Sequence, residues 1–175
     1  MDTFESISTV VSRSLCENEE IFDAYVTRLK SGLPTRNENA RSHFCVYFLP
    51  FNVGSRRVFL VHHKKSGLWL SPGGHIDGGE TLLQALNREI DEELGIKDFF
   101  AEARPFLLTI TLIKNVILPC KEHYDVWFLL PTDGRNFNID PTEFHETRWL
   151  AIDEARKLVT DAANVEALNA VERLC

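Results

Sequence analysis

Signals for membrane insertion or secretion are absent from this sequence. No apolar run in its 175 residues approaches the ~20 residues that a membrane-spanning helix needs. The N-terminus, MDTFESISTVV, has an acidic start and lacks the long apolar region of a secretory signal. We therefore expect a cytoplasmic protein with no membrane partner.

Patterned cysteines are also absent. The four cysteines stand at positions 16, 45, 120 and 175, and no two of them form a CxxC motif. The local pattern therefore supports neither a zinc site nor a redox pair. In a cytoplasmic protein we expect these thiols to be reduced.

Positive charge is scarce. Lys and Arg number 19 against 26 Asp and Glu, which gives a net charge of −7. This balance argues against broad electrostatic binding to nucleic acid or to anionic membranes. An anionic substrate would have to be held by a metal ion and by locally placed basic groups. The length suits one globular unit, and 44% hydrophobic residues are typical of a soluble protein.

What the chain does contain is a glycine-rich loop that opens into a helix, GHIDGGETLLQALNREIDEELGI, from Gly74 to Ile96. Thr81 and Gln84 have the spacing of a capping box. Gly95 can end the helix in the left-handed conformation at little steric cost. At about 100° per residue, one apolar stripe forms along the helix. We expect its residues to be buried: Leu83, Leu86, Ile90 and Leu94.

Three glutamates lie on a neighbouring stripe of the same helix. Glu89, Glu92 and Glu93 are spaced i, i+3 and i+4, so their like charges repel one another. A solvated acidic face is the ordinary interpretation of such a cluster. The glycine-rich loop favours a metal site instead, because glycines let backbone atoms approach a ligand closely. Mg²⁺ or Mn²⁺ fits best, since both prefer carboxylate and water oxygens.

These residues resemble a known family motif, the Nudix box. Its specified positions are all filled by Gly74, five residues, Glu80, seven residues and then Arg88-Glu89-Ile90-Asp91-Glu92-Glu93-Leu94-Gly95-Ile96. The preceding Trp69-Leu70-Ser71-Pro72-Gly73 is similar to the lead-in of the same family. The resemblance implies a Nudix hydrolase, which cleaves a nucleoside diphosphate linked to another group X with the help of a divalent metal ion.

The resemblance also implies roles for single residues. Glu89, Glu92 and Glu93 would hold Mg²⁺ or Mn²⁺, and the Gly74 carbonyl would join them. We expect Glu92, Glu93 and Arg88 to be the catalytic residues.

Other residues of this region would support the site or the substrate. Glu80 would form a structural pair with Arg88, and Gly95 would end the helix. His75, inside the glycine loop, and Trp69 are candidates for substrate binding, although an aromatic residue near a strand is more often part of the core.

The general base is open at this stage. It could be Glu92 or Glu93, or a carboxylate from a later loop. Glu143 and Glu146, which precede the strand of Trp149, are the candidates there.

The rest of the chain predicts an α/β fold. Strands are expected over 43–49, 57–63, 106–112, 116–118, 123–130 and 143–150, with a short helix capped by Asp153 and a last helix over 162–174. Tyr124 and Trp127, on one of these strands, are aromatic candidates for stacking a base but are more typical of a core. Strands on both sides of a central helix indicate an α/β/α sandwich around a mixed sheet, which is also the fold that the resemblance implies.

An extra helical segment precedes this fold. Residues 1–32 are expected to be helical, with Phe4, Ile7, Val11 and Leu15 on one face and Asn18 capping a second stretch. We therefore divide the chain into an N-terminal helical segment with its connector, 1–41, and a Nudix domain, 42–175. The apolar stripe predicts packing on the core or on a second copy in a homodimer.

Three functions stay open. The leading one is a pyrophosphohydrolase that acts on a small nucleotide-type substrate, such as an NTP or an NDP-sugar. The second is an RNA-end pyrophosphatase or an enzyme like isopentenyl-diphosphate isomerase, although the acidic net charge makes nucleic acid a poor partner. The third is a nucleotide-binding Nudix module without catalysis.

Overall fold

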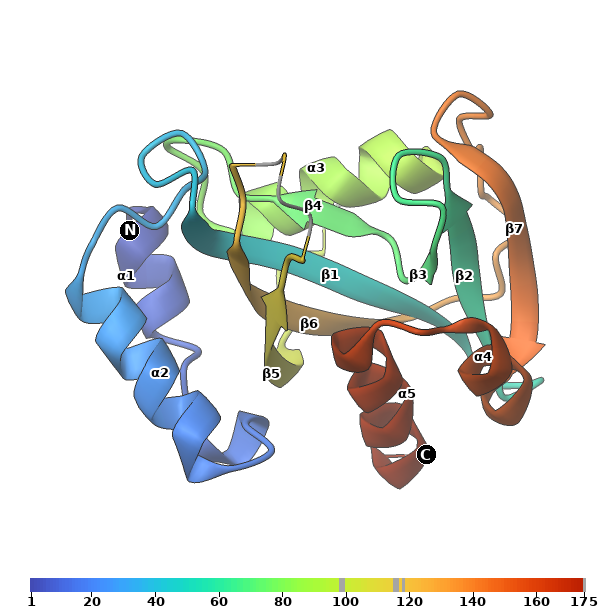
Figure 1. Ribbon diagram of the computed structural model, residues 1–175. Helices are drawn as coiled ribbons and strands as arrows, with labels where there is room; N and C mark the ends of the chain where they lie inside the picture. Colours follow the sequence, from blue (N-terminus) through green and yellow to red (C-terminus); the bar gives the residue numbers. More distant parts are fainter. Residues whose placement is uncertain (98–99, 115–116, 118, 175) are drawn as a thin grey trace.

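Seven strands form one mixed sheet with helices on both faces (Figure 1). The computed structural model describes residues 1–97, 100–114, 117 and 119–174. The strands are β1 (Ser42–Asn52), β2 (Arg57–His63), β3 (Trp69–Leu70), β4 (Gly73–His75), β5 (Pro105–Leu112), β6 (Glu122–Pro131) and β7 (Phe144–Ala151). The helices are α1 (Thr3–Ser8), α2 (Glu19–Lys30), α3 (Leu82–Leu94), α4 (Ile152–Leu158) and α5 (Ala162–Leu174), with a 3₁₀ turn over Arg13–Leu15.

The sheet is built around β1. The strand order is β3-β2-β1-β6-β5, with β4 also paired to β1 and β7 to β2. β1 and β6 run parallel, with His43 opposite His123, whereas the other pairs are antiparallel. The expected hairpin between the first two strands is confirmed by the pairing of Phe51 with Val58.

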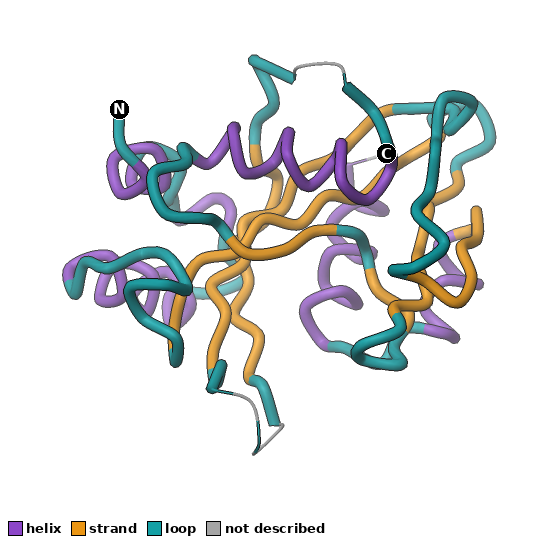
Figure 2. The backbone as a smooth tube through the Cα atoms, turned by 90° about the horizontal axis from the view of Figure 1, so that it is seen from above, coloured by secondary structure: helices purple, strands orange, loops and turns teal. Residues whose placement is uncertain are grey.

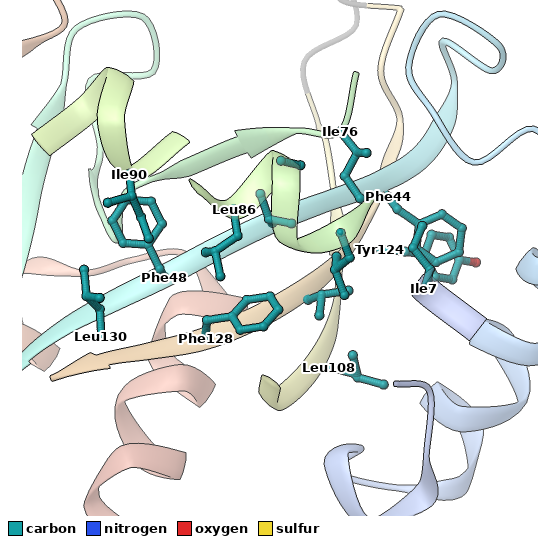
Figure 3. Packing of buried hydrophobic residues seen from close by; sticks show 14 of the residues in the cluster. Ile7, Phe44, Phe48, Ile76, Leu86, Ile90, Leu108, Tyr124, Phe128 and Leu130 are labelled. Carbon is teal, nitrogen blue, oxygen red and sulfur yellow. The ribbon is translucent and has the colours of Figure 1, made fainter. Parts of the chain in front are cut away.

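Each face of the sheet buries its own set of helices. On one face, Leu86 and Ile90 of α3 pack towards Phe48 of β1, and the N-terminal Ile7 joins the same cluster (Figure 3). On the other face, Leu49 packs with α4 and α5, including Leu168. Both views place α1 and α2 at one end of the sheet and α4 at the other (Figures 1 and 2). The α/β/α sandwich is therefore confirmed.

The N-terminal segment follows the prediction only in part. Asn18 caps α2, and its side chain accepts a hydrogen bond from the Ile21 N–H at 3.0 Å. The first helix, in contrast, ends at Ser8, so a single helical face from Phe4 to Leu15 is wrong. The break coincides with the run Thr9-Val10-Val11, whose β-branched side chains lower helix propensity.

Two further expectations differ from the structure. Asp153 does not cap α4, because the N-cap is Ala151 and Asp153 pairs with Arg156 in the first turn. The short strand expected over 116–118 has residues 116 and 118 outside the described part of the chain. Among the described residues, no helix combines the length and apolarity needed to cross a membrane.

Candidate active site

Helix α3 forms as its sequence predicts. The Thr81 side chain accepts from the Gln84 N–H, and the Gln84 side chain accepts from the Thr81 N–H at 2.8 Å. Gly95 ends the helix with φ of 66°, in the left-handed region. Leu86, Ile90 and Leu94 are buried, which fixes how the helix is rotated on the sheet. This rotation turns the glutamate stripe towards the loop around Gly73 and Gly74.

Two of the three glutamates are buried against that loop. Glu89 is 7% and Glu93 8% exposed, whereas Glu92 lies at the surface. Glu93 Oε2 accepts a hydrogen bond from the Gly73 N–H at 2.8 Å. A methyl group at Gly74 would lie 2.6 Å from Glu89 Oε1, so only glycine lets the loop approach this carboxylate. The cluster is therefore not a solvated acidic face.

Arg88 binds several acidic groups and the loop at once. Its guanidinium donates to both oxygens of Glu80, at 2.7 and 3.0 Å. It also donates to Glu89 Oε1 at 2.7 Å, to Glu92 Oε2 at 3.0 Å and to the His75 carbonyl at 2.8 Å. One planar donor group thus fixes the loop and two of the carboxylates on α3.

Burial changes the acidity of these carboxylates. Desolvation raises the pKa of Glu89 to about 7, against the lowering effect of its hydrogen bond from Arg88. Desolvation, with repulsion from Glu89, also raises the pKa of Glu93 well above its ordinary value. For Glu80, partial burial is outweighed by hydrogen bonds from Arg88 and the Asp77 N–H, so its pKa is lowered. Of these three carboxylates, Glu80 is the one that its hydrogen bonds from Arg88 keep ionised, whereas burial favours the protonated forms of Glu89 and Glu93.

The donor set fits a hard divalent cation. Glu89, Glu92 and Glu93 offer carboxylate oxygens, which are the ligands that Mg²⁺ and Mn²⁺ prefer. Arg88 binds the buried Glu89, whereas the buried Glu93 accepts from the Gly73 N–H, so the ionised forms of this like-charged pair need a further positive charge. The close approach of Gly74 to Glu89 brings the loop backbone to the same place.

The two later glutamates have different surroundings. Glu146 is exposed and forms an ion pair with Arg148 at 2.5 Å. Glu143 lies near enough to the cluster for its charge to contribute to the raised pKa of Glu93, although desolvation is the largest cause. Glu143 itself pairs with Lys65, at 3.9 Å between Nζ and Oε2.

The aromatic candidates separate into core and surface. Tyr124 and Trp127 are buried, and the Trp127 ring stacks on Tyr47 with centroids 4.9 Å apart. Trp69 is half-buried on β3, and its ring stacks on His62 with centroids 5.2 Å apart.

The His75 side chain points away from the carboxylates. It joins His43 and His123 on the sheet face opposite α3, with ring centroids 4.9 and 5.1 Å away. Burial lowers the pKa of His75 to about 3 and that of His123 to about 4, so both rings are neutral at pH 7.

Asp125 lies on the same face and is also buried. Its Oδ2 accepts hydrogen bonds from the hydroxyls of Thr109 and Thr111, and desolvation raises its pKa well above the ordinary value. No local spacing predicts that these histidines and Asp125 meet, because they come from separate strands.

A NUDIX domain family model matches residues 20–170 of the chain. The chain belongs to the Nudix hydrolase family. The match begins within α2 and so covers the whole sheet, the carboxylate cluster and part of the N-terminal helical segment.

Relatives with curated names support the assignment. Nudix hydrolase 6 of Arabidopsis thaliana is 28% identical over 138 residues, which are 75% of this Nudix chain and 46% of that protein. The chain therefore spans less than half of that relative. An RNA pyrophosphohydrolase of Erythrobacter litoralis is 30% identical over 115 residues, which are 57% of this chain and 68% of that protein.

Solved structures share the fold. A MutT NUDIX hydrolase from Burkholderia pseudomallei matches with a TM-score of 0.62 and 24% identity, over 75% of this chain and 98% of that one. The E. coli dihydroneopterin triphosphate pyrophosphohydrolase matches with a TM-score of 0.61 and 19% identity, over 79% of this chain and 96% of that one. At these identities the likeness establishes the fold alone.

Proposed function

We propose that this Nudix chain is a metal-dependent pyrophosphohydrolase, whose substrate is a nucleoside diphosphate linked to another group X. The observation that carries the proposal is the burial of Glu89 and Glu93 against the Gly73–Gly74 backbone, where their charges need a cation. The names of its relatives, which include RNA pyrophosphohydrolases, support cleavage of a pyrophosphate bond.

Glu89, Glu92 and Glu93 would hold Mg²⁺ or Mn²⁺, together with the Gly74 carbonyl. When bound, such an ion neutralises phosphate charge and lowers the pKa of a ligated water. Arg88 positions this set, because it binds the Glu89 and Glu92 carboxylates and the His75 carbonyl. Glu80 in turn fixes the Arg88 guanidinium through two hydrogen bonds.

The hydrolysis needs a proton acceptor for the attacking water. The water oxygen bonds to one phosphorus, the bridging P–O bond breaks, and the products are a nucleoside monophosphate and a phosphorylated X. We propose Glu143 as the acceptor of the water proton, because it is the later-loop carboxylate whose charge, after the larger effect of desolvation, contributes to the raised pKa of Glu93. Glu92 and Glu93 stay the alternatives within the box.

Two residues are proposed to contact the parts of the substrate beyond the diphosphate. Trp69 stays a proposed platform for a base, since it is half-buried and its ring already stacks on the flat imidazole of His62. His75 stays a proposed substrate contact through its backbone next to Gly74, since its ring packs against His43 and His123 on the other face of the sheet.

A second candidate is hydrolysis at the triphosphorylated 5′ end of an RNA. It is favoured by the several RNA pyrophosphohydrolases among the relatives. The net charge of −7 disfavours it, because RNA binding relies on positive charge along the phosphate backbone.

The test is phosphate release from a substrate panel with Mg²⁺ and then with Mn²⁺. The panel holds dNTPs, oxidised dGTP, NDP-sugars, ADP-ribose, diadenosine polyphosphates, isopentenyl diphosphate and triphosphorylated RNA. We expect metal-dependent turnover of one class, which falls at least about 100-fold in Glu93→Gln, because a ligand of the cation that stabilises the transition state is lost.

The matched control is Asp91→Asn, which removes an exposed carboxylate from the same helix and should keep turnover within about twofold. Unchanged turnover in Glu93→Gln would contradict the proposed site. Nucleotide binding without turnover at either metal would favour a non-catalytic module.

A cytoplasmic location and a homodimer through the N-terminal helices stay predictions. Cell fractionation checks the location, and light scattering at micromolar concentration checks the homodimer.

A further inference from the structure

Three histidines and a cysteine meet on the sheet face opposite α3. His43 of β1 is paired with His123 of β6, and His75 of β4 is paired with Cys45, two residues further along β1. Paired residues and residues two apart on a strand share a face. The three imidazoles therefore lie on one face. Figure 1 shows the strands that carry them, β4, β1 and β6, next to one another. Cys120, just before β6, completes the group.

The ligand atoms of this cluster are close together and shielded from water. One side-chain donor atom from each of His43, His75, His123 and Cys120 lies within 4.8 Å of the others. The Cys120 Sγ is 3.7 Å from His43 Nε2. His43, His123 and Cys120 are buried, and His75 is half-buried.

The hydrogen bonds leave ring nitrogens free to bind a ligand. His43 Nδ1 lies 3.0 Å from the Asn39 carbonyl and donates to it, so its Nε2 carries a lone pair directed at the cluster. Nε2 of His75 and Nε2 of His123 are buried without a hydrogen-bond partner among the described residues. A buried polar atom without a partner destabilises the folded state. Two such atoms in one cluster therefore point to a ligand that binds both.

We propose that His43, His75, His123 and Cys120 bind a Zn²⁺ ion, at a site separate from the carboxylates of α3. Imidazole nitrogens and a thiolate are the donor types that Zn²⁺ binds, four of them complete a tetrahedral site, and they do not suit Mg²⁺. Tetrahedral zinc needs ligand atoms about 3.3–3.6 Å apart, given Zn–N of about 2.0 Å and Zn–S of about 2.3 Å. Small side-chain rotations would close the cluster to that size, and Cys120 would release its proton on binding.

A neighbouring group is the rival site. Cys45, His123 and Asp125 also place their donor atoms within 4.8 Å of one another. It offers three ligands rather than four. Asp125 Oδ2 accepts from two threonine hydroxyls, whereas its Oδ1 is buried without a hydrogen-bond partner among the described residues. The two groups share His123, so they would compete for one ion. The four-ligand cluster is the one that fits zinc better.

The zinc site would stabilise the loop next to the active site. His75 contributes its ring to the cluster, while its carbonyl accepts from Arg88 at 2.8 Å. Gly74, the preceding residue, lies against Glu89. A metal that fixes the His75 ring would therefore also fix the backbone at the carboxylate site.

Cobalt replacement tests the proposal, because tetrahedral Co²⁺ bound to a thiolate has intense visible bands and a near-ultraviolet charge-transfer band. The full chain, free of any purification tag, is titrated with Co²⁺ in excess Mg²⁺, which occupies the carboxylate site. We expect one equivalent of Co²⁺ with the thiolate band, displaced by one equivalent of Zn²⁺. Cys120→Ser should lose the band.

Two cysteine variants are the controls. Cys16→Ser and Cys45→Ser should keep the thiolate band, since neither residue belongs to the proposed ligand set. Circular dichroism checks that each variant is folded. If Cys120→Ser does not fold, X-ray absorption of the wild-type zinc protein decides, with three nitrogen ligands at about 2.0 Å and one sulfur at about 2.3 Å expected.

Two outcomes would overturn the proposal. One is a wild-type protein with no thiolate band and no sulfur ligand to zinc. The other is a band that is lost in Cys45→Ser and retained in Cys120→Ser, which would place the metal at the rival group. Neither outcome depends on turnover, so the result is independent of the proposed hydrolase function.

Discussion

Glu89 and Glu93 are two buried carboxylates of like charge, so in their ionised forms they lower the stability of the folded chain. Glu89 and Glu93 both have a raised pKa in the folded chain, first of all because they are desolvated. A carboxyl whose pKa is raised on folding binds more protons in the folded than in the unfolded state. Its contribution to stability therefore decreases as the pH rises from the unfolded to the folded pKa. Metal binding would reverse this loss.

The affinity for Mn²⁺ should follow the ionisation of Glu89. Its pKa of about 7 means that, below this pH, a proton must leave before the carboxylate can bind the ion. We expect the affinity to rise about tenfold per pH unit below 7 for one released proton and then to level off. Calorimetry in buffers of different ionisation enthalpy counts the protons. An affinity that is constant from pH 6 to 8 would contradict the prediction.

Glu93→Gln should make the metal-free protein more stable at pH 8 while it abolishes turnover. The glutamine amide is uncharged at every pH, so the folded chain no longer has to bury an ionised carboxylate at this position. Its oxygen can still accept from the Gly73 N–H. Each unit of raised pKa that is removed is worth about 1.4 kcal/mol, or about 3–6 °C in Tm at 2–4 °C per kcal/mol. Thermal unfolding at pH 8 in a chelator measures this. A lower Tm than wild type would show that Glu93 stabilises the fold instead.

At the scale of elements, the site is the junction of one helix and one glycine loop. The sequence predicted the start and the end of α3 and three residues of its buried stripe, because capping and periodicity are local properties. The fourth predicted residue, Leu83, is half-buried, and Leu82 is buried instead. It did not predict the break after Ser8 or the cap of α4. Several residues near each helix end could serve as its boundary or cap. Helix propensity and contacts such as that of Asp153 with Arg156 decide which residue does.

The loop gives a matched pair of glycine substitutions. Gly74→Ala would place a methyl group 2.6 Å from Glu89 Oε1, so the carboxylate or the loop must move. A misplacement of a catalytic group by about 1 Å can lower turnover by about 100-fold. Gly78→Ala, in the same loop, meets no atom within 4 Å and should keep turnover within about twofold. Steady-state kinetics compare the two, and equal losses would show that loop flexibility, rather than the Glu89 contact, is what matters.

At the scale of the whole molecule, distant segments meet through strand register, which a single sequence does not reveal. His43 and His123 are opposite each other only because β1 and β6 pair in parallel in one register. The carboxylate cluster was predictable, since Glu89, Glu92 and Glu93 are neighbours on one helix. The histidine cluster was not, since its members are joined by no local spacing.

The N-terminal segment shows the same long-range dependence, and it contacts the start of the catalytic helix. Ser6 Oγ on α1 accepts a hydrogen bond from the Leu82 N–H at 2.9 Å, and Thr3 Oγ1 donates to the Glu80 carbonyl at 2.6 Å. The Leu82 N–H is among the first amides of α3, which have no partner within the helix. Ser6 therefore caps α3 from a segment that lies outside the box.

Ser6→Ala should leave this buried amide without its acceptor. The expected loss is about 1–2 kcal/mol in the free energy of unfolding, the usual cost of a lost cap. Ser8→Ala is the control, because Ser8 is an exposed residue of the same helix whose hydroxyl bonds only locally, to the Phe4 carbonyl. It should change stability by less than about 0.5 kcal/mol. Urea unfolding measures both variants, and equal losses would mean that α1 itself, and not its contact with α3, determines the effect. A loss confined to Ser6→Ala would show that the N-terminal segment is part of the structure that holds Glu89 and Glu93 against their loop.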